Sequence, residues 1–375
     1  MKRILFFLML CCILLTGCNE RQVEEELLVI VLAIDQTEDH RCLTAIKVPA
    51  NTSASSSSSD REDSGYLLLQ AEGDHFADAI SMLNATTPRR LNFSQVREVI
   101  IGEAVSKQTG FITLLQQIDN LPRFRCSAAV IICQGEAMEF IKEQKPYVGM
   151  RLSRYAENTL ASNAGKGFTP STDLCAGVRD LGFGFSDPLF ILGAVNNFNH
   201  SENQSEEKSL DTKAGSLPRK SLEAIEMFGA AATDGISVCG YISGYEMALI
   251  HLLSGHVEAL TMQQGSITLH ITVGKPASLS VDISQTPIVL HISLQCEALY
   301  SPGSNPDIVL VENQLQKDLL TLISHLQSIR CDGIGFGDVA VKNFLTIPDW
   351  ESFNWRVQYA QAAVQAKVKV LGKEK

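Results

Sequence analysis

Apolar residues in the first half of the chain fall into short runs, separated by stretches with helical spacing. The runs at 27–34, 96–101 and 126–133 are short and mostly apolar, which is typical of strands buried inside a sheet. Apolar residues three and four positions apart predict helices between these runs, at 74–88, 103–118 and 136–163. This alternation of strands and helices indicates a sheet covered by helices.

The period of the pattern changes to two after residue 266. Alternating apolar and polar residues predict three half-buried strands of an antiparallel meander, at 267–273, 279–283 and 288–294. A long helix is expected to start at Asn305-Pro306, followed by a last strand at 356–371. The predicted fold class is α+β, multi-domain and mixed α/β, with an N-terminal sheet-and-helix region and a C-terminal antiparallel sheet packed by one long helix.

Two polar stretches interrupt this pattern. The serine-rich segment 51–64 has almost nothing apolar to bury, which predicts a mobile loop. Segment 196–222 is also polar and is the expected linker between a domain at 18–195 and a domain at 223–375. Directly after this linker, the Asp234-Gly235 pair between two apolar segments predicts a β-hairpin, because both residues tolerate positive φ.

The first eighteen residues have the features of a bacterial lipoprotein leader. Lys2 and Arg3 precede an apolar run at 4–15, which is too short for a permanent membrane helix but suits a signal peptide. The run ends in Leu15-Thr16-Gly17-Cys18, which resembles a lipobox. We expect residues 1–17 to be removed and Cys18 to carry lipid. The alternative is that residues 4–15 form an uncleaved anchor or a buried helix.

The composition is that of a folded protein with an acidic surface. Hydrophobic residues make up 45% of the 375 residues and charged residues 19%, which makes disorder of the whole chain implausible. The formal net charge is -11, and without residues 1–17 it is -13, with 29 basic residues against 42 acidic ones. Such a surface repels a phosphate backbone, so nucleic acid is excluded as an expected partner.

Seven cysteines remain after the leader and Cys18, and they show no C-x-x-C pair. Most lie in apolar, strand-like runs, so buried reduced thiols are the expected state. Zinc ligation and disulfide bonds are the alternatives. The seven are Cys42, Cys126, Cys133, Cys175, Cys239, Cys296 and Cys331.

The sequence contains no motif that would require catalysis. The eight histidines show no H-E-x-x-H spacing, and no G-x-S-x-G elbow occurs. Gly333-Ile334-Gly335-Phe336-Gly337 has the glycines of a dinucleotide fingerprint but follows a predicted helix, so a tight backbone bend is expected there. We therefore predict no catalytic, cofactor-binding or metal-binding residues and no enzymatic activity.

Several segments together resemble the Ger(x)C family of spore germination lipoproteins. The lipobox at Cys18 is followed by an apolar strand that ends in Asp35, and further similar segments run from Arg89 to Glu103 and from Asp119 to Arg125. Near the C-terminus, Asp332 to Gly337 is similar to the family's D-x-x-G-F-G signature, and Pro348-Asp349-Trp350 to its P-x-W signature. Departures occur at Ala33, at Asn19-Glu20 and at Gln95.

This resemblance implies a function in spore germination. The chain would be the C subunit of a nutrient germinant receptor, a non-enzymatic lipoprotein that works with two integral-membrane subunits of the A and B types. It would be held by Cys18 on the extracytoplasmic face of the inner spore membrane. The same lipobox and two-domain layout also fit a lipid-anchored solute-binding protein of a transporter, which is the alternative function.

Overall fold

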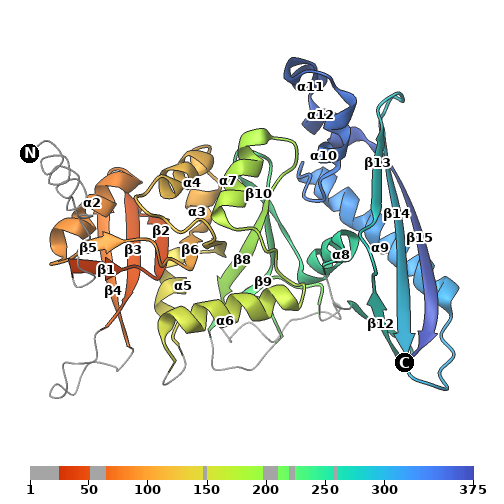
Figure 1. Ribbon diagram of the computed structural model, residues 1–375, viewed down its shortest axis with the longest axis horizontal. Coiled ribbons are helices and arrows are strands. Elements are labelled where there is room, and N and C mark those ends of the chain that lie inside the picture. Colours follow the sequence, from red (N-terminus) through yellow and green to blue (C-terminus); the bar gives the residue numbers. More distant parts are fainter. Residues whose placement is uncertain (1–24, 51–64, 147–149, 197–209, 219–223, 257–259) are drawn as a thin grey trace, which may run out of the picture.

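The computed structural model describes residues 25–50, 65–146, 150–196, 210–218, 224–256 and 260–375. The signal peptide predicted at 1–17, Cys18 and the predicted serine-rich loop at 51–64 lie outside these ranges. The described chain is elongated, with one sheet at each end and helices packed on both (Figure 1). The structure is a multi-domain α+β fold, as the sequence predicts.

The larger sheet has eight strands in the order β10-β9-β8-β7-β6-β2-β3-β4. Strands β2, β6, β7 and β8 run parallel in its centre, and the other four join antiparallel at its two sides. The central strands are buried along most of their length, which explains their continuous apolar sequences. Their bounds are β2 Val31–Gln36, β3 Cys42–Pro49, β4 Tyr66–Gly73, β6 Glu98–Ile101, β7 Ala129–Gln134, β8 Leu189–Val195, β9 Ile225–Thr233 and β10 Val238–Ile242.

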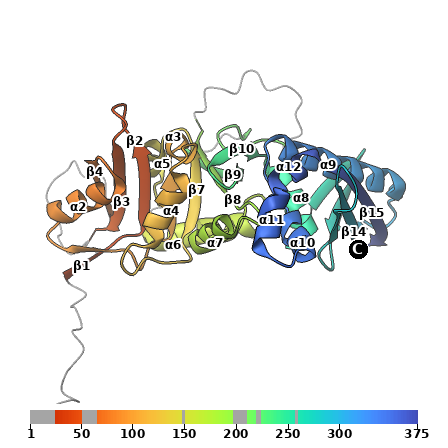
Figure 2. The same ribbon diagram turned by 90° about the horizontal axis from the view of Figure 1, so that it is seen from above.

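Helices cover both faces of this sheet (Figure 2). Apolar side chains of α2, α4 and α7 share one core with the sheet, and side chains of α5 and α6 share the core on the opposite face. The prediction of a sheet covered by helices is therefore confirmed. The helices are α2 Phe76–Thr86, α3 Glu103–Ser106, α4 Phe111–Asp119, α5 Ala137–Glu143, α6 Leu152–Gly165 and α7 Leu174–Phe183.

The first strand lies apart from the large sheet. Strand β1, Glu26–Leu28, pairs in parallel with β5, Arg90–Asn92, as a separate two-stranded sheet. This pair lies at the edge of the molecule where the described chain begins (Figure 2).

The large sheet continues past the predicted linker. Strands β9 and β10 form the hairpin predicted at Asp234-Gly235, where Gly235 has a φ of 80°, and β9 pairs with β8. The buried Glu226 carboxylate of β9 accepts hydrogen bonds from the Asn196 side chain and from the backbone N–H of Gly215, at 2.6 and 2.7 Å. Residues 210–218, inside the predicted linker, are thus attached to the sheet, and the domain bounds stay a prediction.

The C-terminal region combines a five-stranded sheet with helices. Its sheet has the order β11-β12-β14-β13, with β15 on the other side of β14. Helix α9 packs its Val311, Leu315, Leu319, Leu322 and Leu326 stripe into the core, as predicted. The elements are α8 Gly244–Ser254, β11 Leu260–Gln264, β12 Ile267–Thr272, β13 Ser278–Asp282, β14 Val289–Tyr300, α9 Ile308–Ser328, α10 Phe336–Ala340, α11 Ile347–Phe353, α12 Trp355–Gln361 and β15 Ala363–Glu374.

Three details of this region differ from the sequence prediction. Strand β15 pairs parallel to β14, so the sheet is mixed and not purely antiparallel. Residues 356–361, predicted as strand, belong to helix α12, because Trp355 and Tyr359 lie four residues apart and are both buried. Helix α9 is capped by Asp307, whose side chain accepts from Leu310 N–H at 3.1 Å, and not by Asn305.

Within the described ranges, no helix is both long enough and apolar enough to cross a membrane.

Candidate functional site

The predicted lipidation site, Cys18, is not among the described residues, so lipidation stays a prediction. It lies eight positions before Glu26, the first residue of β1. The structure does describe the other residues that carry the resemblance, and it shows what they do.

Asp332 holds the glycine-rich turn of the D-x-x-G-F-G segment together. Its buried carboxylate accepts hydrogen bonds from the backbone N–H groups of Gly335, Phe336 and Gly337, at 3.1, 3.0 and 2.6 Å. The indole Nε1 of Trp355 donates a fourth bond at 3.0 Å. Burial raises the pKa of Asp332 to about 6, and the amides of Gly337 and Phe336 oppose this rise. At neutral pH the group is therefore an ionised acceptor with four donors.

Glycine is required at two positions of this turn. Gly335 has a φ of 91°, which other residues rarely adopt. A Cβ on Gly337 would lie 1.8 Å from the backbone oxygen of Phe185, so a side chain would displace that loop. The turn is the tight bend that the sequence predicts.

A second buried carboxylate links this turn to the large sheet. Asp187, just before β8, accepts from the Asp332 N–H at 2.8 Å through one oxygen, and from Arg356 at 2.6 Å through the other. Burial raises the pKa of Asp187, while the Arg356 guanidinium lowers it. The sequence alone does not identify Asp187 and Arg356 as site residues. The residues that surround each of them give no sign of a partner so distant in the sequence. We call Asp187, Asp332, Trp355 and Arg356 the aspartate junction.

Aromatic rings surround the aspartate junction. The Trp350 ring of the P-x-W segment lies 5.8 Å from the Trp355 ring and 5.9 Å from the Phe185 ring, measured between centroids. Phe344 and Phe353 complete this cluster at 5.5 and 6.4 Å from Trp350. The C-terminal signature residues therefore join the small helices α10 to α12 to the loop that precedes β8.

Asp35, at the end of β2, is another buried carboxylate that accepts hydrogen bonds from the backbone, as Asp332 does. Its buried carboxylate accepts from the backbone N–H of Met138 in α5 at 3.1 Å and from that of Gln36 at 3.3 Å. Burial raises the pKa of Asp35. A Cβ on Gly102 would lie 2.1 Å from an oxygen of this carboxylate, so the segment that follows β6 packs against it.

A hollow of about 460 Å³ opens beside Asp35. Besides Asp35, polar side chains from the β2–β3 turn, from the start of α2, from the loop between α3 and α4 and from α4 line it, including His40, His75, Gln108 and Gln117. Its size and mixed lining suit a small polar solute.

Lys47 and Glu98 form a buried polar pair that the sequence pattern does not reveal. They flank Val31 on neighbouring strands, and Gln144 joins them. The Lys47 ammonium donates to the Gln144 carbonyl, and the Gln144 amide donates to Glu98 at 2.5 Å. Burial lowers the pKa of Lys47 to about 7 and raises that of Glu98 to about 7. Both positions lie in strands that otherwise look purely apolar.

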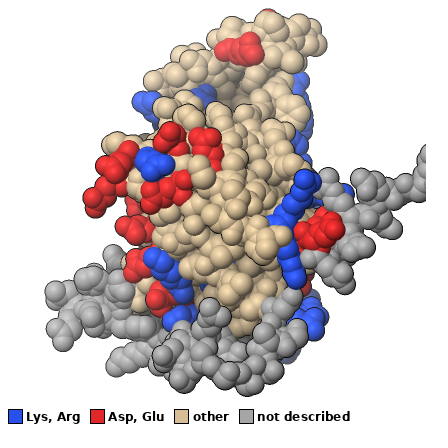
Figure 3. Space-filling model, turned by 90° about the vertical axis from the view of Figure 1, so that its left-hand side faces the viewer, with Lys and Arg blue, Asp and Glu red and all other residues tan. Residues whose placement is uncertain are grey.

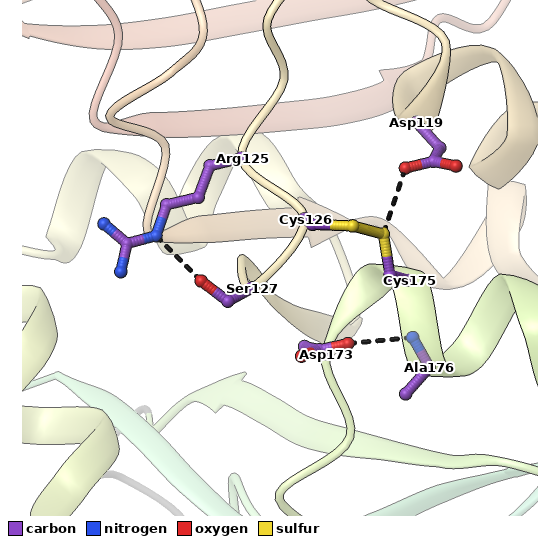
Figure 4. The surroundings of a disulfide bond; sticks show 7 residues. All are labelled: Asp119, Arg125, Cys126, Ser127, Asp173, Cys175 and Ala176. Atoms are coloured by element: carbon purple, nitrogen blue, oxygen red, sulfur yellow. Dashed lines mark hydrogen bonds between the residues drawn. A yellow bond between two sulfur atoms is a disulfide. The ribbon is translucent and has the colours of Figure 1, made fainter.

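The expectation of reduced cysteines is wrong for one pair. Cys126 and Cys175 form a disulfide that connects the loop before β7 to the first turn of α7 (Figure 4). The Asp119 carboxylate lies 3.3 Å from the sulfur of Cys175. The two half-cystines are 49 residues apart, so their pairing could not be read from the sequence. Among the described residues, the other five cysteines are free, as expected.

The fold and these sites define a multi-domain α+β protein whose signature carboxylates hold turns and helix starts in place. The chain belongs to the GerAC-like family of spore germination proteins. The family model "Spore germination protein N-terminal domain" matches residues 19–189, and "Spore germination B3/ GerAC like, C-terminal" matches residues 229–371. Together the two models cover most of the chain.

Known proteins resemble it at low identity. A protein provisionally named as the spore germination protein YfkR of Bacillus subtilis (strain 168) is 20% identical over 380 residues, which covers 95% of this chain and 92% of that protein. Spore germination protein KC of the same organism is 23% identical over 138 residues, or 36% of this chain and 34% of that protein. The crystal structure of the GerBC protein is similar with a TM-score of 0.49 and 13% identity, over 91% of this chain and 96% of that chain.

Proposed function

We propose that this chain is a non-enzymatic, membrane-anchored subunit of a spore germinant receptor, required for the germination response to nutrients. The match of both family models carries this proposal, because together they span residues 19–189 and 229–371. The lipobox supports an anchor at Cys18, which would hold the chain on the extracytoplasmic face of the inner spore membrane. Its partners would be two integral-membrane subunits, of the A and B types.

The geometry of the signature carboxylates agrees with a role in shaping the fold. All four donors to Asp332 belong to the protein itself, and so do the backbone donors to Asp35. The Asp332 carboxylate, with four donors, is poorly placed to act as a general base, because its lone pairs are already used. We infer that the chain works through contacts with other proteins.

Deleting the gene tests this function. Spores of the deletion strain should fail to respond to at least one nutrient, while vegetative growth continues normally. The loss of optical density after nutrient addition is the measurement, in a background from which related receptors have been removed. Restoring the gene should restore the response. Normal germination of the deletion spores with every nutrient would contradict the proposal.

The hollow beside Asp35 favours one second candidate, a solute-binding protein of a transporter. In that case the isolated chain should bind one small polar solute tightly, and Gln108→Leu, inside the hollow, should weaken binding at least tenfold. Calorimetric titration with amino acids and sugars distinguishes the two functions. If the chain is a receptor subunit that acts through other proteins, the titrations show no saturable heat.

A further inference from the structure

Five arginines line the edge of the molecule beside β1. Glu26 in β1 pairs in register with Arg90 of β5, and its carboxylate lies 3.3 Å from the guanidinium of Arg123. The backbone of Arg125 is bonded to Phe93, just after β5. The row consists of Arg90, Arg97, Arg123, Arg125 and Arg154, and we call it the arginine row.

The row is continuous from β5 to the start of α6. Burial and, second, the positive charge of Arg97 lower the pKa of Arg125. Arg97 and Arg154 both approach Glu157, at 2.7 and 3.8 Å. Glu157 thus joins Arg97 and Arg154, and Glu26 lies between Arg123 and the backbone of Arg90.

Two glutamates balance only part of this charge. These five arginines with Glu26 and Glu157 sum to +3, and the neighbouring exposed Glu25 reduces this to +2, in a chain whose net charge is -11. Figure 3 shows basic side chains, with an acidic patch beside them, along the right-hand edge of this end of the molecule, and mainly acidic side chains, with some basic ones, at the opposite edge. The two edges of this end therefore differ in charge.

Much of the row is free to meet a ligand. The Arg123 side chain is 65% exposed, and Arg90 and Arg154 are also exposed. Arg125 donates from Nε to Ser127 at 2.9 Å, and its terminal nitrogens point away from the disulfide (Figure 4). Within the described ranges, those two nitrogens and the Arg90 guanidinium have no hydrogen-bond partner. Forked donors of this kind match phosphate oxygens well.

The position of the row points to a membrane. Glu26 lies eight positions after Cys18, and at about 3.4 Å per position this stretch reaches at most about 27 Å. If Cys18 carries lipid, the end of the molecule with β1 is held near the lipid headgroups. The rest of the surface, being acidic, is repelled by anionic lipid.

We propose that the arginine row is a docking surface for the phosphate groups of an anionic lipid membrane. Its role is to orient the chain, with β1 and β5 toward the bilayer and the acidic edge away from it. This inference rests on the proposed membrane anchoring, but it assigns a separate contact that does not need the lipid on Cys18.

Vesicle binding by the unlipidated chain tests the proposal. The chain from residue 18 onward, with Cys18→Ser, keeps every described residue and cannot be lipidated. It should bind vesicles of equal parts phosphatidylglycerol and phosphatidylcholine, and binding should weaken as salt is added. The variant Arg90→Gln, Arg123→Gln, Arg125→Gln should bind about a hundredfold more weakly, since each basic residue near such a surface contributes about a fivefold factor.

A matched variant keeps this test specific. Lys317→Gln, Lys342→Gln, Lys373→Gln removes the same charge from exposed positions of the C-terminal region, and it should bind like the parent chain. Circular dichroism and thermal melting should be the same for all three proteins. Equal loss in both variants, or no preference of the parent for anionic over neutral vesicles, would overturn the proposal. Failure of lipid attachment in cells would affect only the proposed anchoring, because this experiment contains no acyl chain.

Discussion

Replacing Asp332 with alanine is expected to lower the free energy of unfolding of the C-terminal region by about 4 kcal/mol. The substitution removes the acceptor of three buried backbone N–H groups and of the Trp355 indole. It also breaks the contact between the Asp332 segment and Asp187, because the turn is no longer fixed. Removing one partner from a buried, charged network typically costs about 3–5 kcal/mol.

Urea denaturation followed by tryptophan fluorescence measures this effect directly. The chain has only two tryptophans, Trp350 and Trp355, and both are part of or next to the aspartate junction. Asp338→Ala is the control, because Asp338 lies in α10, directly after the turn that Asp332 holds, but is exposed. Its expected cost is below about 0.5 kcal/mol. Equal midpoints for Asp332→Ala and the unchanged chain would refute the role assigned to this carboxylate.

Cys18→Ser is expected to abolish lipid attachment, and either to release the protein into the soluble fraction or to leave its leader uncleaved. Without the thiol no diacylglycerol can be attached, and the leader cannot be removed by the lipoprotein route. Two acyl chains contribute about 0.8 kcal/mol per buried methylene, far more than the arginine row alone, so a chain that has lost its leader but carries no lipid should be almost completely lost from the membrane fraction. Cell fractionation measures membrane retention, and mass spectrometry of the N-terminal peptide shows whether lipid is attached and whether the leader is removed.

Cys42→Ser is the matched control for this substitution. Cys42 is a free cysteine in β3, so the same chemical change there should leave the protein in the membrane fraction. Normal cleavage together with unchanged membrane retention of Cys18→Ser would show that something other than a lipid on Cys18 holds the chain.

The large sheet could be predicted because its signals are local. Each central strand is a short apolar run, and each helix shows its own spacing, so neighbouring residues are sufficient to identify them. The hairpin at Asp234-Gly235 was predicted for the same reason, since its turn chemistry lies in two adjacent residues. The direction of β15 was not, because its parallel pairing with β14 depends on residues more than sixty positions away.

For the sites too, features set by neighbouring residues could be predicted, and features set by distant residues could not. The bend at Gly333 to Gly337 was predicted from its glycines, but its connection to Asp187 spans 145 residues. The disulfide was missed because seven cysteines allow many pairings, and only the fold brings Cys126 and Cys175 together. Lys47 and Glu98 were missed because each is a single charged residue in an apolar strand. Long-range contacts decide these features, and a local pattern does not contain them.

Isolation of the chain from spore membranes is the most direct test of the central claim, which is that it acts as an anchored subunit of a germinant receptor. The full chain is tagged at its C-terminus and extracted from inner spore membranes in mild detergent. Two integral-membrane subunits, of the A and B types, should copurify with it in constant proportion. Smaller amounts of both integral-membrane subunits should copurify with the Cys18→Ser chain. A chain that leaves the membrane without either subunit, while the spores still respond to nutrients through it, would contradict the account.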